Sequence, residues 1–248
     1  MLPKPVAALP GDLVEGATVL ADRDALLPLL PRGGTVVEVG VALGTFSRKV
    51  IDACQPALFV AIDNFRLHEL SEFWGQPPSH YFGAKTHAAW YRDQFAVEIA
   101  SGRARIIEGD SAAGMDQLAD ASVDVFYIDA DHTYEGITRD LAVAIRKIKP
   151  DGWLVINDYV LVDALGAAEP YGVIYATNEF MLRHRWAMQY LALQTNMYCD
   201  VVLRPADLAP PLRGRLAALE YENTVLRNST SWRVTAPLRS FARLFGRP

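Results

Sequence analysis

The sequence predicts an α/β protein with one doubly wound, mostly parallel sheet of seven strands and a short helical C-terminal tail. From residue 35 onward, short β-branched runs alternate with segments of helical spacing, the pattern of parallel strands whose connecting helices cover both faces of a sheet. Of the 248 residues, 51% are hydrophobic and 21% charged, which is ordinary for a globular chain. This length allows one large domain, expected at residues 1–208, and an appendage at residues 209–248.

Each strand is expected where an apolar run is bounded by glycine, proline or polar residues. The seven strands are Thr35–Val39, Leu58–Ile62, Ala104–Ile107, Val123–Ile128, Trp153–Ile156, Met188–Gln194 and Tyr198–Leu203. Helical spacing marks Thr45–Cys54, Thr86–Ala100, a short helix from Ala112, Tyr134–Ile148 and Asn178–Arg185. We interpret residues 149–152, Lys-Pro-Asp-Gly, as the stop of the helix before them. Residues 64–82, rich in aromatics, His, Gly and Pro, are the expected lid.

Composition narrows the classes of partner and compartment. The net charge of −5 carries no basic signature, so we expect no nucleic-acid partner. Two cysteines, Cys54 and Cys199, make neither a disulfide framework nor a zinc cluster, which fits a reducing cytoplasm. Prolines interrupt the N-terminus, so we expect no signal peptide. No run approaches the ~20 apolar residues of a spanning helix.

Polar residues stand at five successive strand ends. In open α/β sheets, ligands bind beyond the carboxyl ends of the strands. The residues at those ends are Glu38, Gly40, Asp63, Asp110, Ser111, Asp129, Asp131, His132, Asn157 and Asp158. Together they would line one edge of the sheet, and this is the strongest functional signal in the sequence.

The turn from Gly40 to Gly44 lets the backbone pass close to a ligand, because neither glycine has a Cβ. Its G-x-x-x-G spacing differs from the G-x-G-x-x-G of a dinucleotide site. Asp63, nineteen residues after Gly44, suits a ribose diol, although a helix cap is the plainer role for such an acid. Asp110 and Ser111 can orient an adenine edge, cap the helix at Ala112, or do both.

Asp129, Asn157 and Asp158 supply three hard oxygen donors at neighbouring strand ends. Such donors suit Mg²⁺ or another oxygen-preferring divalent ion, which can lower the pKa of a substrate hydroxyl. His132 or Asp131 would then accept the proton as general base. The plainer interpretation is that Asp131 and His132 cap the helix at Tyr134.

These residues resemble a known family. The resemblance lies in Glu38-Val39-Gly40-Val41-Ala42-Leu43-Gly44, Asp63, Gly109-Asp110-Ser111, Ile128-Asp129-Ala130-Asp131-His132-Thr133-Tyr134-Glu135-Gly136 and Asn157-Asp158-Tyr159. They are similar to the cation-dependent class I O-methyltransferases, above all the bacterial sugar-modifying branch that includes macrocin O-methyltransferase. Catechol and caffeoyl-CoA O-methyltransferases are similar more distantly. The resemblance covers about residues 30–204.

The resemblance implies a Rossmann-like methyltransferase fold, an S-adenosylmethionine cofactor and methylation of a hydroxyl on a sugar or surface glycan. A catechol-like small-molecule acceptor and a non-catalytic cofactor-binding scaffold are the alternatives. By position, Glu38, Gly40 and Gly44 would approach the methionine part of the cofactor, Asp63 the ribose, and Asp110 with Ser111 the adenine. Asp129 belongs with both the cofactor and the Mg²⁺ ligands, and Asn157 and Asp158 complete the metal set.

Two positions depart from the family. The Asn157-Asp158 pair is Asp-Asp in the sugar branch and Asp-Asn in the catechol branch, so a neutral donor replaces a carboxylate here. His132 lies nearest the catalytic Lys of the catechol enzymes, whereas the sugar branch favours the acid at Asp131. The resemblance leaves the choice of base open.

The tail contains two patterns. Leu212, Leu216, Leu219, Asn223 and Leu226 are spaced as a short coiled-coil seam, which can form a homodimer or fold back on the domain. In residues 237–247, apolar and Arg positions fall on opposite helical faces, as in an interfacial helix. The segment 231–239, Ser-Trp-Arg-Val-Thr-Ala-Pro-Leu-Arg, resembles tails of bacterial surface-polysaccharide enzymes. We therefore expect a cytoplasmic protein that docks at the inner membrane or on a polysaccharide-assembly partner, the alternative being a disordered or self-packed tail.

Overall fold

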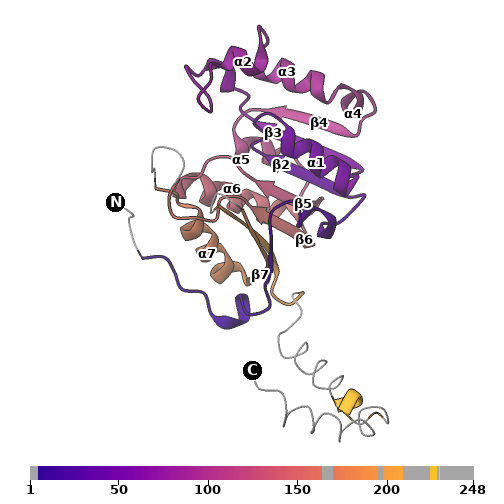
Figure 1. Cartoon of the computed structure of the whole chain (residues 1–248), viewed down its shortest axis with the longest axis vertical. Coiled ribbons are helices and arrows are strands. Elements are labelled where there is room, and N and C mark those ends of the chain that lie inside the picture. The colour runs from indigo at the N-terminus through magenta and orange to yellow at the C-terminus, as the bar shows by residue number, and fades with distance from the viewer. Residues whose placement is uncertain (1–4, 164–169, 195–197, 209–223, 228, 230–248) are drawn as a thin grey trace, which may run out of the picture. The chain divides into compact units, whose positions relative to one another are not determined.

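The computed structural model describes residues 5–163, 170–194, 198–208, 224–227 and 229. Its centre is a sheet of eight strands in the order β1-β7-β8-β6-β5-β2-β3-β4 (Figure 1). The strands are β1 Thr18–Leu20, β2 Thr35–Val39, β3 Leu58–Asp63, β4 Ala104–Glu108, β5 Val123–Ile128, β6 Ile148–Ile156, β7 Trp186–Leu193 and β8 Cys199–Pro205. Strand β8 is antiparallel to β6 and β7, and every other pairing is parallel. The predicted fold class is confirmed, with one strand more than expected, because the three-residue β1 pairs with β7.

The described helices follow the alternation that the sequence predicts. They are α1 Thr45–Cys54, α2 Pro78–Phe82, α3 His87–Gln94, α4 Ala96–Ala100, α5 Ser111–Asp116, α6 Tyr134–Lys147 and α7 Val173–His184, with 3-10 turns η1 Gly11–Leu13, η2 Leu27–Leu29 and η3 Leu67–Glu69. The hydroxyls of Thr86 and Thr133 cap α3 and α6 by accepting from backbone N–H groups, which satisfies donors that a helix start leaves free.

Three sequence predictions need correction. The helix expected at residues 86–100 is two helices, because Phe95 leaves the helical conformation (φ −116°, ψ 23°) where its ring packs on Tyr91. Helix α7 begins at Val173, five residues before the expected start. Residues 149–152 belong to β6 and not to a loop after α6. Ile148 pairs with Val123 and the next pair is Val125 with Trp153, so Pro150 lies in an irregularity of the ladder, where a missing N–H is tolerated.

Alternate residues of each central strand enter two separate cores. In β2, Val37 and Val39 face one core while Val36 faces the other. The first core is closed by α5, α6 and α7, and the second by η2, α1 and α3 (Figure 1). Because both faces are covered, the carboxyl edge of the strands is the exposed part of the sheet on which polar residues can gather.

The chain divides into two compact units, Met1–Ala209 and Pro210–Pro248. The second is described only at residues 224–227, which are helical, and at residue 229. Of the predicted seam only Leu226 falls among the described residues, and the predicted membrane-binding helix at 237–247 lies outside them. Where the structure is described, none of the helices combines the length and apolar character needed to cross a bilayer.

Candidate functional site

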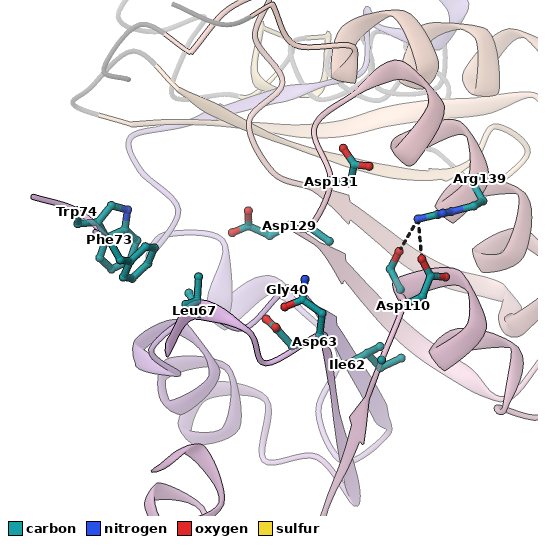
Figure 2. A pocket seen from close by; sticks show the side chains of 15 residues that line it. Gly40, Ile62, Asp63, Leu67, Phe73, Trp74, Asp110, Asp129, Asp131 and Arg139 are labelled. Atoms are coloured by element: carbon teal, nitrogen blue, oxygen red, sulfur yellow. Dashed lines mark hydrogen bonds and ion pairs between the residues drawn. The ribbon is translucent and has the colours of Figure 1, made fainter. Parts of the chain in front are cut away.

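Two neighbouring cavities open at the carboxyl edge of the sheet. The larger, of about 530 Å³, is lined by the predicted residues Gly40, Asp63, Asp110, Ser111, Asp129 and Asp131 (Figure 2). The smaller, of about 310 Å³, is lined by Glu38, Gly40 and Asp129 among others. Gly40 and Asp129 belong to both linings. The structure therefore brings together residues from the ends of β2, β3, β4 and β5 around two spaces that share one border.

At Gly40 the backbone that follows β2 passes close to the backbone that follows β5. The φ of Gly40 is +83°, and a Cβ there would lie 1.9 Å from the backbone oxygen of Asp129. Gly44 has φ +68° and faces the rings of Phe95 and Tyr91. It forms the N-cap of α1 and lines neither cavity. A side chain at Gly40 is thus excluded by the Asp129 backbone, at the place that borders both cavities. A side chain at Gly44 is excluded by the Phe95 and Tyr91 rings, away from the cavities.

Asp63 holds the glycine turn in place. Its Oδ2 accepts a hydrogen bond from the Val41 N–H at 2.8 Å, and its Oδ1 accepts from the Phe65 N–H at 2.7 Å. A carboxylate has about four acceptor sites, so these two bonds leave capacity for a diol in the larger cavity.

Asp110 and Ser111 have structural partners as well as a place in the larger cavity. Asp110 caps α5 by accepting from the Ala113 N–H at 3.0 Å, so the predicted cap is confirmed. It also pairs with Arg139 at 3.0 Å. The Ser111 hydroxyl donates to Asp140 at 2.6 Å. Asp131 accepts from the Thr133 N–H at 2.9 Å just ahead of α6, for which Thr133 is the N-cap.

Glu38 is an acid inside the sheet. It is only 2% exposed, and among the described residues its buried Oε2 has no hydrogen-bond partner. Burial raises the pKa of Glu38 from 4.5 to about 8, and the Asp129 and Asp63 charges add to this, while a Ser47 hydrogen bond and Arg23 oppose it. A buried carboxyl of this kind is destabilised as an anion unless a cationic group enters the smaller cavity.

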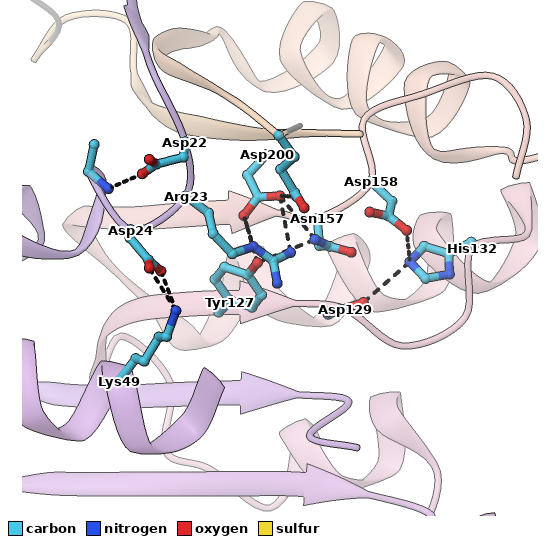
Figure 3. Close-up of polar contacts among 12 residues, drawn as sticks. Asp22, Arg23, Asp24, Lys49, Tyr127, Asp129, His132, Asn157, Asp158 and Asp200 are labelled. Carbon is cyan, nitrogen blue, oxygen red and sulfur yellow. Dashed lines mark hydrogen bonds and ion pairs between the residues drawn. The ribbon is translucent and has the colours of Figure 1, made fainter. Parts of the chain in front are cut away.

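His132 lies between two carboxylates. Its Nε2 is 3.4 Å from Asp129 Oδ1 and 3.7 Å from Asp158 Oδ2 (Figure 3), and its ring stacks on Tyr171 at 4.6 Å. Burial alone would lower the pKa of His132, but the nearby Asp129 carboxylate, with the charge of Asp158, raises it. Burial raises the pKa of Asp158 to about 7, assisted by the Asp129 charge. The three side chains form a half-buried pair of acids with a base between them.

Asn157 is oriented by an acid that the sequence analysis did not single out. Its Nδ2 donates to Asp200 Oδ1 at 2.9 Å. Asp200, fully buried in β8, also accepts from the Tyr127 hydroxyl at 2.6 Å and from Gln194 at 2.7 Å. With the Asn157 nitrogen so engaged, its Oδ1 points toward Asp129 and Asp158 (Figure 3).

A second residue that sequence reasoning missed is Arg23. It precedes the first predicted strand, and nothing in the surrounding residues 22–24 marks it as part of a site. Asp200, in contrast, has a visible signal, because it is a lone acid within the apolar run at residues 199–203.

The donor set can be compared with what a divalent cation requires. Two carboxylates, Asp129 and Asp158, both approach the Nε2 of His132, and the Asn157 amide oxygen points toward them. These are hard oxygen donors, which fit Mg²⁺ by chemistry. In the described part of the chain there is no group of three or more His, Cys, Asp or Glu side chains placed to hold a metal ion, so the third donor in such a set is a neutral amide.

Comparisons with known proteins agree with this arrangement. Residues 37–159, which contain every predicted site residue, match a family model described as a methyltransferase domain. Precorrin-6y C5,15-methyltransferase from Geobacter metallireducens GS-15 is similar at 13% identity and a TM-score of 0.51, over 73% of this chain and 85% of its own. Cofactor-bound Rv0187 from MTB is similar at 16% identity and a TM-score of 0.51, over 74% and 79%.

The pyocyanin biosynthetic protein PhzM is similar at 17% identity and a TM-score of 0.48, over 73% of this chain and 53% of PhzM, so the chain spans about half its length. Identities this low show a common fold alone. No curated protein matches the sequence.

Proposed function

We propose that the chain is an S-adenosylmethionine-dependent methyltransferase, because residues 37–159 match a methyltransferase-domain model, and that it methylates a hydroxyl oxygen of a sugar or surface glycan. The observation that carries the proposal is the position of Asp129. It borders both cavities and lies 3.4 Å from the imidazole nitrogen of His132. His132, a candidate base, therefore lies beside Asp129, where the two cavities adjoin and the two parts of the cofactor would meet.

The two cavities suit the two parts of the cofactor. In the larger cavity, Asp63 would bind the ribose diol, and Asp110 with Ser111 would face the adenine. In the smaller cavity, Glu38 would accept hydrogen bonds from the α-ammonium group. The sulfonium and its methyl group would then lie near Gly40 and Asp129, which are among the residues that the two linings share.

In the proposed reaction the imidazole of His132, whose Nε2 faces Asp129 and Asp158, accepts the proton of the acceptor hydroxyl. The oxygen attacks the methyl carbon in line, the carbon–sulfur bond breaks with its electron pair on sulfur, and S-adenosylhomocysteine leaves. Asp129 and Asp158 stabilise the imidazolium, as the raised pKa of His132 indicates. His132 then returns the proton to solvent. Holding the two reactants in line can contribute about 7–11 kcal/mol.

Asp129, Asn157 and Asp158 are the residues that would hold a divalent cation. When bound, such a cation would lower the pKa of the acceptor hydroxyl and make it a better nucleophile. Asp131 is the alternative base, and it lines the larger cavity. Its Oδ1 accepts from the Thr133 N–H, so Oδ2 is the oxygen that would take the proton.

The acceptor would enter past the lid. Trp74 is 67% exposed, stacks on Phe73 at 4.1 Å and lines both cavities (Figure 2). A flat aromatic face suits the apolar face of a sugar ring and equally an aromatic acceptor. The preference for a sugar rests on the family resemblance, and a catechol-like acceptor is the second candidate. Membrane, polysaccharide-assembly and homodimer partners of the tail stay predictions.

The test is transfer of labelled methyl from S-adenosylmethionine to nucleotide-sugars, lipid-linked glycans and catechols. With an accepted substrate, we expect His132→Asn to lower kcat by roughly 10²–10⁴, the usual contribution of a general base, while S-adenosylhomocysteine still binds. Asp131→Asn is the matched variant and should retain most turnover. If Asp131→Asn shows the loss instead, the base is misassigned. Turnover that survives both EDTA and Asp129→Ala would reject metal assistance, and labelling of catechols alone would reject the sugar acceptor.

A further inference from the structure

The smaller cavity is lined by a cationic side chain, Arg23, that belongs neither to the glycine turn nor to the strand ends. We propose that Arg23 binds the α-carboxylate of the methionine end of the cofactor, opposite the α-ammonium at Glu38. This inference rests on the S-adenosylmethionine dependence stated above. It makes Arg23 a cofactor-binding residue contributed by the segment between β1 and η2, outside the part of the chain that matches the family model.

The Arg23 guanidinium is held on three sides. It lies 4.8 Å from the Phe46 ring centroid and 5.7 Å from that of Tyr127, and two of its nitrogens are 3.3 and 3.4 Å from Asp200 (Figure 3). These contacts fix the plane of the guanidinium and turn it toward the cavity that Arg23 lines. Cation–π contacts favour a desolvated guanidinium in this setting.

The existing contacts leave the guanidinium incompletely satisfied. Both distances to Asp200 are long for charge-assisted hydrogen bonds, which are usually 2.7–2.9 Å. Within the described residues the buried Nε has no hydrogen-bond partner. Asp200 is itself shared among Tyr127, Asn157 and Gln194, so it cannot be devoted to Arg23. Because a guanidinium has five donors in a planar fork, Arg23 can bind a second carboxylate from the cavity.

The cavity is complementary to an amino-acid zwitterion. Glu38 and Arg23 line the same 310 Å³ space. Among the described residues, Glu38 Oε2 has no hydrogen-bond partner, and the Arg23 guanidinium has only its long contacts to Asp200. An α-amino acid carries an ammonium and a carboxylate on one carbon, so it can satisfy both residues at once. An uncharged ligand would leave the Glu38 oxygen without a partner and Arg23 with Asp200 alone, which is costly.

Lys49 is the rival cation, because it also lines the smaller cavity. Its Nζ, however, pairs with both oxygens of Asp24, at 2.8 and 2.7 Å. Both side chains are about half exposed, so Lys49 is already neutralised in contact with solvent. This contrast makes Lys49→Met a matched control for Arg23→Met.

The experiment measures the affinity of the full chain by calorimetry for S-adenosylhomocysteine and for its decarboxylated analogue, which lacks only the α-carboxylate. A lost hydrogen bond between charged groups corresponds to a roughly 10- to 150-fold change in affinity. We expect Arg23→Met to lose about that factor for S-adenosylhomocysteine and less than about threefold for the analogue. Lys49→Met should change neither affinity. Arg23→Lys keeps the positive charge but loses the planar set of guanidinium donors. Its affinity for S-adenosylhomocysteine should therefore lie between those of wild type and Arg23→Met.

Equal weakening of both ligands in Arg23→Met and Arg23→Lys would mean that Arg23 only supports the fold, and would overturn the proposal. A selective loss in Lys49→Met would transfer the role to that residue and overturn it as well. If Arg23→Met does not fold, the ratio of the two affinities in Arg23→Lys decides. Wild-type protein that binds neither ligand would contradict the S-adenosylmethionine dependence instead, so the two failures are distinguishable.

Discussion

Replacing Gly40 by alanine tests whether the edge between the two cavities depends on a missing Cβ. The new methyl would lie 1.9 Å from the Asp129 carbonyl oxygen and 2.6 Å from its carbon. Backbone atoms of a central strand cannot rotate away as a side chain can. Restoring a 3.0 Å separation requires a shift of about 1.1 Å (3.0 minus 1.9). The hydrogen bonds at stake run from Asp129 N to Val39 O and from Gly40 N to Ile62 O.

Two contributions set the expected loss of stability. A left-handed backbone conformation costs a residue with a Cβ about 1–2 kcal/mol, and Gly40 has φ +83°. Forcing a methyl into a filled space costs about 1–3 kcal/mol. Gly40→Ala should therefore lower the free energy of unfolding by roughly 2–5 kcal/mol. The matched control is Gly33→Ala, because Gly33 has φ +76° and no atom within 4 Å of its Cβ position. That variant should show only the first contribution.

Denaturant unfolding measures the loss in free energy of unfolding, and a methyl-transfer assay measures the loss in kcat/KM. Moving Asp129 by about 1 Å should lower kcat/KM roughly 100-fold, since catalysis is that sensitive to misplacement, whereas Gly33→Ala should leave turnover unchanged. The reasoning is refuted if Gly40→Ala matches Gly33→Ala within about 0.5 kcal/mol and retains full turnover.

Two further predictions follow from burial. Because the pKa of Glu38 rises from 4.5 to about 8 on folding, its contribution to apo-protein stability is full below pH 4.5 and is lost as pH rises toward 8. Thermal melts should therefore show a melting temperature that falls between pH 4.5 and 8, and Glu38→Gln should remove this fall. An unchanged profile in that variant would contradict the prediction. Trp74→Ala should change the free energy of unfolding by less than about 0.5 kcal/mol, because the Trp74 side chain is 67% exposed. Phe65→Ala should lower it by about 3–5 kcal/mol, because Phe65 is only 1% exposed. Equal losses in denaturant unfolding would show that both aromatic side chains only pack.

The parts of the structure that could be predicted from sequence are those with a local signal. Strand β2 is an apolar run with Glu38 near its end, and β5 is an apolar run followed by Asp129, so the sheet and its polar edge follow from pattern. Strand β1 has three residues and forms only because β7 is available to pair with it, which no local pattern reveals. The break between α3 and α4 lies at Phe95, where the sequence has neither glycine nor proline to mark it.

The same distinction holds within the site. Asp129 and Asp63 stand at strand ends in the sequence and line a cavity in the structure. Arg23 reaches the site from a segment with no recognisable pattern, and its partner Asp200 is 177 residues away. Contacts at such a separation depend on the strand order, which places β8 between β7 and β6. Phe65 was grouped with the lid aromatics by sequence, but it packs beneath the turn against His87 and Tyr91.

The acids of the two cavities differ in whether their charge is already satisfied. In the larger cavity, Asp63 accepts two backbone hydrogen bonds and Asp110 pairs with Arg139. In the smaller cavity, Glu38 Oε2 has no hydrogen-bond partner among the described residues. Burial raises the pKa of Glu38 to about 8 and that of Asp158, beside this cavity, to about 7. Buried acids of this kind favour a cationic guest, since a positive charge stabilises their ionised form. The larger cavity therefore suits the neutral adenosine, and the smaller one suits the end of the cofactor that carries the ammonium and borders the sulfonium.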